Sequence, residues 1–393
     1  TDYYGLQPQG AEGDPDKPTI SDAIRKALLD EGFIAPTNFA PLSRTKWSLA
    51  SRTDKGVHAA CAAASVNLET LSDDLVEQEE LVASGDPAAV AYEAKITAYG
   101  AKALSKGGVK EPPPQPEWRL SDTALQRLNN ALPSNLKVFS GTRVRKRFDA
   151  RDHASSRVYE YLLPLHAVGG TAAELDEVLR SFEGTHKMHN FASGLRGSHA
   201  NAEIFRVEEE DDSLEWPLAL KGNEQSSAAF RSVVTCRVHR EVTIEGDDYL
   251  VLRIAGLAFV LHQIRHMVGA ALAVTNKIVP LDVMRIALTS PLRVDISPLV
   301  PGCGLLLDQI SWFSLKSGDY EARVPNEARE AMEAFKADCI YPHIHSLYQD
   351  GAYEQFLSEL REGNYTKVYD QGDYEKLRRV HLAWKVHVKG LAE

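Results

Sequence analysis

Strand-like and helix-like segments alternate in both halves of this 393-residue chain, and this alternation limits the fold more than any other feature. The clearest helix is predicted over residues 258–275, because Ile264, Met267, Val268 and Leu272 recur at helical spacing on one face. Strand–helix–strand units, weakly duplicated, occur in each half. The sequence therefore predicts an α+β protein in which the sheets of two halves join.

The remaining elements follow from shorter patterns. Thr19 and Asp22 form a capping box that predicts a helix over 19–33, which ends at Gly32. Glu245-Gly246-Asp247-Asp248 marks a hairpin turn. Strands are predicted over 57–68, 138–144, 158–163, 230–245, 249–254 and 305–312, and further helices over 124–132 and 175–182.

Composition shifts divide the chain into three parts. We expect an N-terminal half at 1–119, a C-terminal half at 120–315 and a polar, helical extension at 316–393. Within the first half, residues 70–117 read as an insertion, with an acidic run at 73–80 that favours a helix. Paired glycines and three consecutive prolines then form a linker.

Overall charge and cysteine usage limit the function. The net charge of -11 argues against nucleic-acid binding over the whole surface, although it permits a local basic groove. The four cysteines form no C-x-x-C pair, which indicates neither a zinc ribbon nor a disulfide framework and favours a reducing compartment. No run approaches 18 apolar residues, so no membrane span is predicted.

One carboxylate occupies a turn with unusual neighbours. Asp54 follows Arg52 and precedes Lys55 and Gly56, and glycine permits a tight turn where a side chain would clash. Two cations beside a carboxylate favour its ionised form, which suits a nucleophile or a base and not a proton donor. On the residues alone, a surface turn with an ordinary ion pair stays open.

The densest basic stretch lies at 143–157. Cations at this density suit RNA phosphates, and the alternative is a solvated strand edge. The acidic runs at 73–80 and 208–212 should face away from RNA, because like charge repels phosphate. The basic residues are Arg143, Arg145, Lys146, Arg147, Arg151 and Arg157.

A pair of histidines raises the alternative of a metal site. His262 and His266 stand four residues apart on the predicted helix, which is a zinc-ligand spacing. Gln263 stands where a metalloprotease needs a glutamate, and no third ligand is evident. We therefore predict no metal and interpret both as ordinary helix histidines.

Several segments, in order, resemble motifs of the TruA family of tRNA pseudouridine synthases. The departures are His266, where lysine is usual, and Met188, where an aromatic is common. Residues 335–342 also resemble the tail of the eukaryotic multisite tRNA pseudouridine synthases. The matching segments are Thr1 to Gln7, Arg52 to Ala59, Phe148 to Arg151, Arg157 to Tyr161, Gly184 to Phe191, His262 to Gly269 and Pro301 to Leu307.

This resemblance implies a fold and a set of roles. The fold is two ferredoxin-like (RRM-like) halves joined into one central, mostly antiparallel sheet, with helices on one face and the catalytic cleft between the halves. Asp54 matches the catalytic aspartate, Tyr159 the tyrosine that packs on the flipped uracil, and Arg265 the arginine that pairs with the aspartate. Arg52 matches the arginine that fills the space left by the flipped base. Lys55, Gln263 and His262 join the basic stretch as expected RNA-binding residues.

The resemblance also implies the reaction and its partners. Uridine becomes pseudouridine without redox chemistry or energy input, so no cofactor is expected. The substrate is tRNA, with ribosomal RNA as an alternative, and a catalytically silent RNA-binding or ribosome-assembly factor is a second alternative. A homodimer or a larger ribonucleoprotein assembly stays open, as does the choice between nucleus and mitochondrion. The family's first strand would lie upstream of Thr1.

Overall fold

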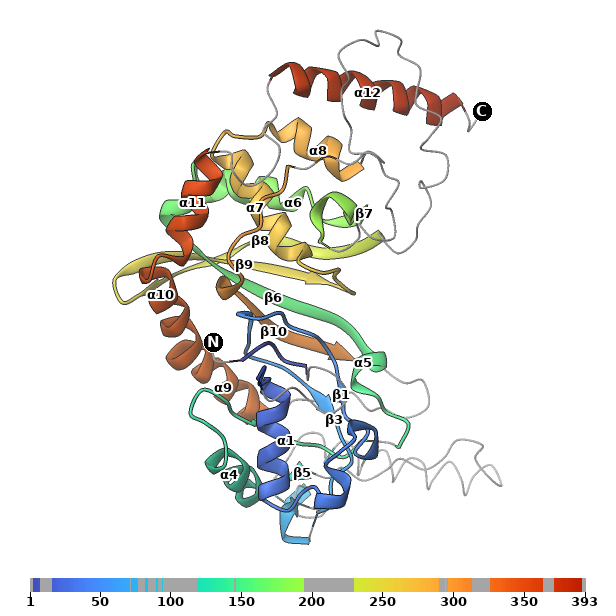
Figure 1. Ribbon diagram of the computed structural model, residues 1–393, viewed down its shortest axis with the longest axis vertical. Helices are drawn as coiled ribbons and strands as arrows, with labels where there is room; N and C mark the ends of the chain where they lie inside the picture. The colour runs from blue at the N-terminus through green and yellow to red at the C-terminus, as the bar shows by residue number, and fades with distance from the viewer. Residues whose placement is uncertain are drawn as a thin grey trace. The chain divides into compact units, whose positions relative to one another are not determined.

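The computed structural model is mixed α+β (Figure 1). The described residues are 3–7, 16–70, 72–76, 82–83, 90, 94, 119–144, 146–193, 230–289, 294, 296–312, 326–362 and 371–390. The chain divides into two compact units. Unit 1 holds residues 1–155 and 307–340, and unit 2 holds residues 156–306 and 341–393.

The largest sheet has six strands in the order β2-β10-β6-β9-β8-β7, and its long ladders are antiparallel. Together with the helices, this confirms the predicted α+β class and the central, mostly antiparallel sheet; the two-half arrangement stays a prediction. The strands are β2 (His58–Ala59), β6 (Ala154–Pro164), β7 (Gly184–Lys187), β8 (Phe230–Ile244), β9 (Asp247–Gly256) and β10 (Leu305–Trp312).

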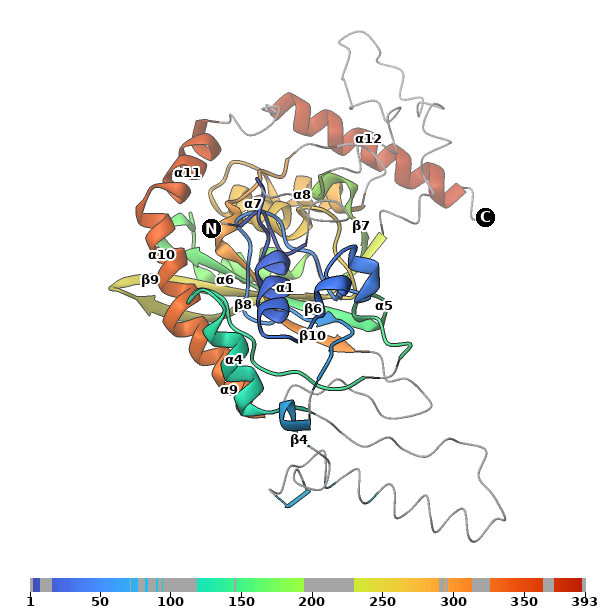
Figure 2. The same ribbon diagram turned by 60° about the horizontal axis from the view of Figure 1, so that its bottom comes forward.

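Unit 1 has its helical core between α1 (Ile20–Asp30) and α4 (Asp122–Asn130), which lie side by side in both views of the ribbon (Figures 1 and 2). Leu28 and Phe33 pack against Leu128 there. The Thr19–Asp22 capping box is present, and Gly32 has a positive φ directly after the helix, as predicted. The other elements of this unit are β1 (Ser48–Leu49), β3 (Ala64–Ser65), β4 (Leu75–Val76), β5 (Arg119–Leu120), α5 (Ala150–His153) and α9 (Asn326–Phe335).

Unit 2 places α6 (Ala172–Arg180) and α7 (Gln263–Thr275) on the same side of strands β6, β8 and β9 (Figure 1). Nearly every residue of α7 is buried, because its sequence is apolar almost all round. Its remaining α-helices are α8 (Leu281–Thr289), α10 (Tyr341–Gln349), α11 (Ala352–Glu362) and α12 (Gln371–Gly390).

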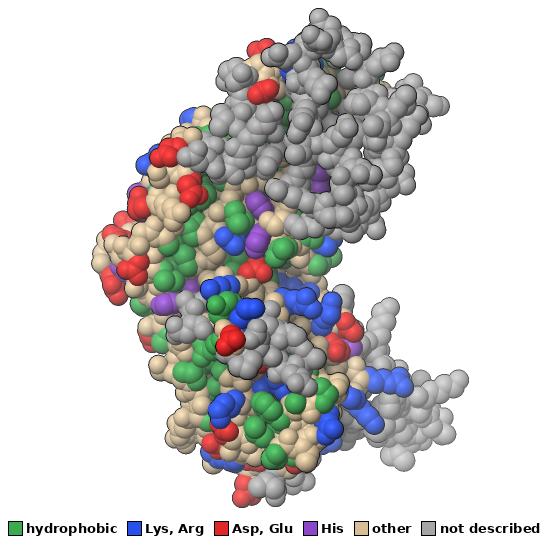
Figure 3. All heavy atoms as spheres, in the orientation of Figure 1, with side chains coloured by type: hydrophobic (Ala, Val, Ile, Leu, Met, Phe, Trp, Pro, Cys, Tyr) green, Lys and Arg blue, Asp and Glu red, His purple; other side chains and the backbone are tan. Residues whose placement is uncertain are grey.

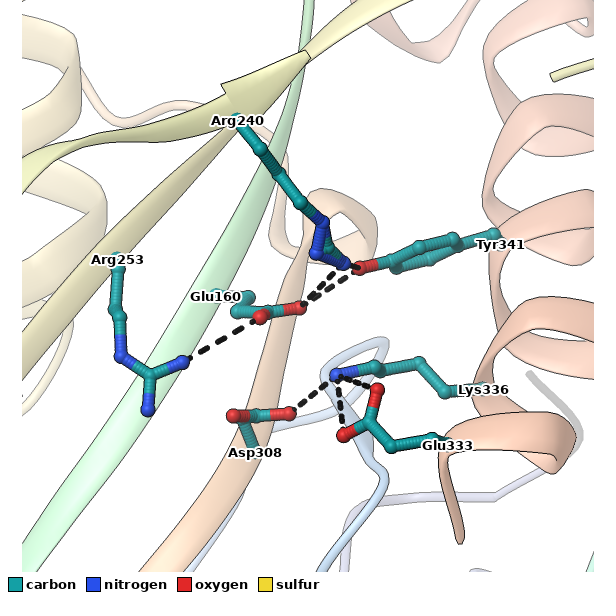
Figure 4. A network of polar contacts seen from close by, with 7 residues as sticks. All are labelled: Glu160, Arg240, Arg253, Asp308, Glu333, Lys336 and Tyr341. Carbon is teal, nitrogen blue, oxygen red and sulfur yellow. Dashed lines mark hydrogen bonds and ion pairs between the residues drawn. The ribbon is translucent and has the colours of Figure 1, made fainter. Parts of the chain in front are cut away.

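Two buried charged clusters fasten the extension to strands (Figure 4). In unit 2, Glu160 accepts a hydrogen bond from the Tyr341 hydroxyl at 2.7 Å and lies 3.7 Å from Arg253 and 3.8 Å from Arg240. In unit 1, Lys336 donates to Asp308 on β10 at 2.6 Å, with both side chains almost fully buried. A buried charge needs such a partner, because it has lost its hydration.

Two predicted strands are wrong in detail. The segment 57–68 forms only β2 and β3, two residues each, with a bend of small residues between them. Alanine is a poor strand former, and Ala60 and Cys61 both donate to Leu307 O, which breaks the ladder. The segment 138–144 forms one isolated bridge, Arg119 with Thr142. Its first residue, Val138, bonds the Asn129 side chain through both its N–H and its carbonyl.

Two predicted helices also differ. The helix expected over 258–275 begins at Gln263, because His262 has a left-handed φ of 60° and the Gln263 amide oxygen accepts from Val260 N. The acidic run at 73–80 is not helical where it is described. One 3-10 turn (Ser72–Asp74) leads into β4, which pairs with β5. Residues 77–80 and 208–212 lie outside the described residues.

Candidate active site

Asp54 occupies the tight turn between β1 and β2 in unit 1. Gly56 has a φ of 82°, and Val57 N donates to Asp54 O at 3.1 Å, so the turn predicted from the sequence is present. Thr53 and Val57 are buried, whereas Asp54 is partly exposed and Arg52 and Lys55 are exposed. Buried residues therefore anchor the turn on both sides of a carboxylate that solvent can reach.

The segment at residues 3–7 supports this turn from outside. Gly5 has a φ of 106°, and a Cβ there would lie 2.6 Å from Thr53 O, so only glycine fits. Leu6 N donates to the same Thr53 carbonyl at 3.4 Å. The Lys55 ammonium lies 4.3 Å from the centre of the Tyr4 ring, a cation–π distance that ties the Lys55 side chain to this segment.

Tyr159 lies on β6 in unit 2 and is 8% exposed. Its ring meets Phe259 edge to face, with centroids 5.5 Å apart. Two residues earlier on the strand, Arg157 donates to Leu257 O at 3.1 Å, and burial lowers the pKa of its guanidinium. The backbone of β6 fixes both side chains through its antiparallel ladder with β9.

Arg265 is on the first turn of α7, also in unit 2. Its Nε donates to Val300 O at 2.7 Å, and the side chain is partly exposed. This bond fixes the plane of the guanidinium, because the group is rigid and planar. Neighbouring Gln263 is 1% exposed, and its amide nitrogen donates to the sulfur of Met267 at 3.6 Å.

His262 and His266 share one serine. Ser193 Oγ lies 3.0 Å from His262 Nδ1 and 3.1 Å from His266 Nε2, and His266 Nδ1 lies 2.8 Å from Ser297 O. Within the described ranges no three potential ligands gather into a metal-binding group. The two imidazoles therefore belong to a chain of hydrogen bonds, in which Ser193 links the start of α7 to the end of the 3-10 turn at Met188–Phe191.

The basic stretch before β6 is exposed in unit 1. Asp149 caps α5, accepting from Arg151 N and Asp152 N, and also accepts from Ser48 Oγ at 2.7 Å. Burial acts to raise the Asp149 pKa, but these hydrogen bonds outweigh burial and lower it. Arg145 lies outside the described residues. The exposed cations are Arg143, Lys146, Arg147 and Arg151.

Acidic side chains gather elsewhere, on α11 and the β8–β9 hairpin of unit 2, at the left of Figure 3. Phosphate would be repelled there. No described helix is both long and apolar enough to cross a membrane. The exposed acids include Glu245, Asp247, Asp248, Glu354 and Glu359.

The predicted site residues thus form two groups. Arg52, Asp54, Lys55 and the basic stretch at 143–151 lie in unit 1, whereas Arg157, Tyr159, His262, Gln263 and Arg265 lie in unit 2. Each group lies within a single unit. The pairing of Asp54 with Arg265 stays a prediction.

Sequence reasoning missed the residues that hold these groups in place. Gly5 belongs to the first matching motif, but the sequence does not explain why glycine is required there. The reason is the close approach of this position to Thr53 O. Ser193 carries no motif of its own. Asp149 could have been found as a helix cap, because it directly precedes the short helix α5.

Comparison with known proteins gives a consistent picture. A family model described as tRNA pseudouridine synthase matches residues 178–312. The human "Pseudouridylate synthase 1 homolog" is 24% identical over 385 residues, covering 93% of this chain and 71% of the relative. The Candida glabrata "tRNA pseudouridine synthase 1" is 24% identical, covering 92% and 70%. The Saccharomyces cerevisiae "tRNA pseudouridine(27/28) synthase" is 26% identical, covering 78% and 80%.

The matched region contains all of β7, β8, β9, α7, α8 and β10, and the relatives extend the likeness across both units. The chain belongs to the TruA family of tRNA pseudouridine synthases, with eukaryotic homologues over most of its length. The family makes it an isomerase.

Proposed function

We propose that this chain isomerises uridine to pseudouridine in tRNA and that Asp54 is the reacting carboxylate. The observation that carries the proposal is the Asp54 turn, which is anchored by buried neighbours and supported by Gly5 while its carboxylate remains accessible. In the reaction the N1–C1′ bond breaks, the uracil turns, a C5–C1′ bond forms, and C5 loses a proton as N1 gains one. Atoms and electrons balance without a co-reactant.

Asp54 has two ways to act. It can attack C1′ as a nucleophile and later leave, or it can remove a proton from the ribose. Both require an ionised carboxylate, and two exposed cations, Arg52 and Lys55, lie on the same turn. Arg265 would pair with this carboxylate, and Arg52 would fill the space that the flipped base leaves in the RNA.

Tyr159 would receive the flipped base. Unstacking a uridine costs a few kcal/mol, and stacking on an aromatic ring returns about 1–3 kcal/mol. The Phe259 edge contact holds the Tyr159 ring in one orientation, which lowers the entropy lost on binding.

RNA contact is assigned to the exposed cations and to residues near the two site groups. The exposed Arg143, Lys146, Arg147 and Arg151 suit phosphates. Lys55 directly follows Asp54 in the sequence, Arg157 lies two residues before Tyr159, and His262 and Gln263 lie just before Arg265. Gln263 would have to exchange an internal hydrogen bond for an RNA contact, because its amide is already used. Arg145 is proposed as an RNA-binding residue only because it belongs to the same basic stretch of the sequence.

The wider setting is proposed on the same basis. No cofactor or metal is assigned to the reaction, and tRNA is the partner. Gel filtration with and without tRNA would separate a monomer from a homodimer or a ribonucleoprotein assembly. Fractionating cells would separate the nucleus from the mitochondrion.

The function is tested by tritium release from RNA labelled at uridine C5. We expect release from unmodified tRNA transcripts, unchanged after dialysis against a chelator. Release only from ribosomal RNA would move the substrate to that class, and tight binding without release would show a silent RNA-binding factor. Stoichiometric zinc with activity lost to the chelator would restore the metal alternative at His262 and His266. Mapping pseudouridines in total RNA with and without the protein would then identify the sites.

A further inference from the structure

Two adjacent carbonyls in unit 2 tie Arg265 to strand β6. Val300 O accepts from Arg265 Nε at 2.7 Å, and the next carbonyl, Pro301 O, accepts from the Tyr161 hydroxyl at 3.0 Å. Val300 and Tyr161 are both 0% exposed. The short segment before the 3-10 turn at Gly302–Gly304 is therefore held by α7 through one carbonyl and by β6 through the next.

The same strand carries Tyr159. Because side chains alternate along a strand, Tyr159 and Tyr161 project from the same face of β6, and Glu160 projects from the other. Figure 4 shows Glu160 bound to Arg240, Arg253 and Tyr341, which fixes this part of the strand from its opposite face. Tyr161 thus connects the carbonyl segment of Arg265 to the strand that presents the base-stacking tyrosine.

The hydroxyl of Tyr161 is a buried hydrogen-bond donor to this segment. Burial raises its pKa well above the usual value, so the group stays a donor at every working pH. A Cβ on Gly304 would lie 2.9 Å from Cζ of Tyr161, which shows how closely the segment packs on the ring. Without the hydroxyl, the Pro301 carbonyl would lose this donor, and the segment would lose its hydrogen bond to β6.

We propose that Tyr161 is a positioning residue for Arg265. It sets the place of the Val300 carbonyl, and that carbonyl sets the plane of the guanidinium relative to Tyr159. The inference rests on the proposed function, since it assigns Arg265 to the reaction. It adds a residue that touches neither substrate nor reacting atoms.

The test is Tyr161→Phe, which removes one oxygen and keeps the ring. The matched control is Tyr249→Phe on β9, because Tyr249 is also a buried strand tyrosine, and its hydroxyl pairs with His345 Nδ1 at 2.7 Å and not with the carbonyl segment. Each protein is measured for its melting temperature, its tRNA Kd and its single-turnover rate at saturating tRNA, at pH 6 and pH 8.

We expect both variants to lose similar stability and to keep tRNA affinity within about twofold. Tyr161→Phe should lower the single-turnover rate about tenfold, more at pH 6 than at pH 8, because a misplaced arginine protects the ionised carboxylate less well. Tyr249→Phe should keep the rate within about twofold. In a double variant with Arg265→Met, Tyr161→Phe should lower the rate little further, because Tyr161 acts on the rate only by positioning Arg265.

An equal rate for the two tyrosine variants would overturn the inference, and so would a full additional loss in the double variant. If Tyr161→Phe is unfolded at the assay temperature while Tyr249→Phe is folded, the rate is measured on the folded fraction at a lower temperature, where the same tenfold difference is required. Failure of the proposed function is a different result, since the wild-type protein would then release no tritium at all.

Discussion

The two groups of site residues are held by different means. The Asp54 turn in unit 1 depends on backbone conformation: Gly5 and Gly56 at positive φ, a pair of two-residue strands and an exposed surface. The Arg265 and Tyr159 group in unit 2 depends on two buried elements, α7 and β6, and on side-chain hydrogen bonds to the carbonyls of Val300 and Pro301. A change near Asp54 should therefore affect activity more than stability, whereas a change near Arg265 should affect both.

The largest effect on rate, apart from Asp54 itself, is expected from Arg265→Met. Loss of the cation should lower the single-turnover rate about 10²-fold, a magnitude typical of removing one aimed donor. The loss should be greater at pH 6 than at pH 8, because a carboxylate without its cation is protonated more readily. A fall in tRNA affinity with an unchanged saturated rate at both pH values would make Arg265 a phosphate ligand and refute the pairing.

Gly269→Ala should give the largest effect on stability. Alanine is the better helix former by about 1 kcal/mol, but the new Cβ would lie 1.9 Å from Pro298 O, and backbone cannot move as a flexible side chain does. We expect a net loss of about 1–3 kcal/mol in the free energy of unfolding, measured in urea. A stabilised protein would show that the packing of α7 on this segment is looser than the structure indicates.

Gly5→Ala should separate activity from stability. The φ of 106° and the approach to Thr53 O both oppose a side chain, so the Asp54 turn should shift and the rate fall about tenfold. Gly246→Ala is the control, because it has a φ of 97° in the β8–β9 hairpin with nothing within 4 Å of the new Cβ. The control should lose about 1 kcal/mol of stability and no activity. Equal rates in the two variants would remove Gly5 from the account.

The smallest effect should come from neutralising the basic stretch. Arg147→Gln or Arg151→Gln should lower tRNA affinity and reduce the slope of log K against log salt by about one unit for each phosphate that is no longer neutralised. The rate at saturating tRNA should stay within about twofold. An unchanged salt slope for both would place these exposed cations away from the RNA.

Local signals predicted the structure best. The capping box at Thr19 and Asp22 and the turn at Gly56 were predicted because each depends on residues a few positions apart. The strand expected over 138–144 failed because Asn129 bonds Val138, a competition between side chain and backbone that periodicity does not report.

The site shows the same limit. Asp54, Tyr159 and Arg265 are predicted as site residues because their motifs resemble those of a family, and the family is confirmed. The partner of Tyr161 is 140 residues away in the sequence, so no spacing rule could have linked it to Arg265. Supporting residues of this kind become visible only when the fold is built.

The most direct test of the account is Asp54→Asn, which keeps the shape of the side chain and removes its charge. Tritium release and tRNA affinity are measured on the same preparation. We predict that tRNA affinity stays within about threefold while the single-turnover rate falls by at least about 10³-fold. Turnover retained at a rate close to that of the wild-type protein would contradict the assignment of Asp54 as the reacting carboxylate.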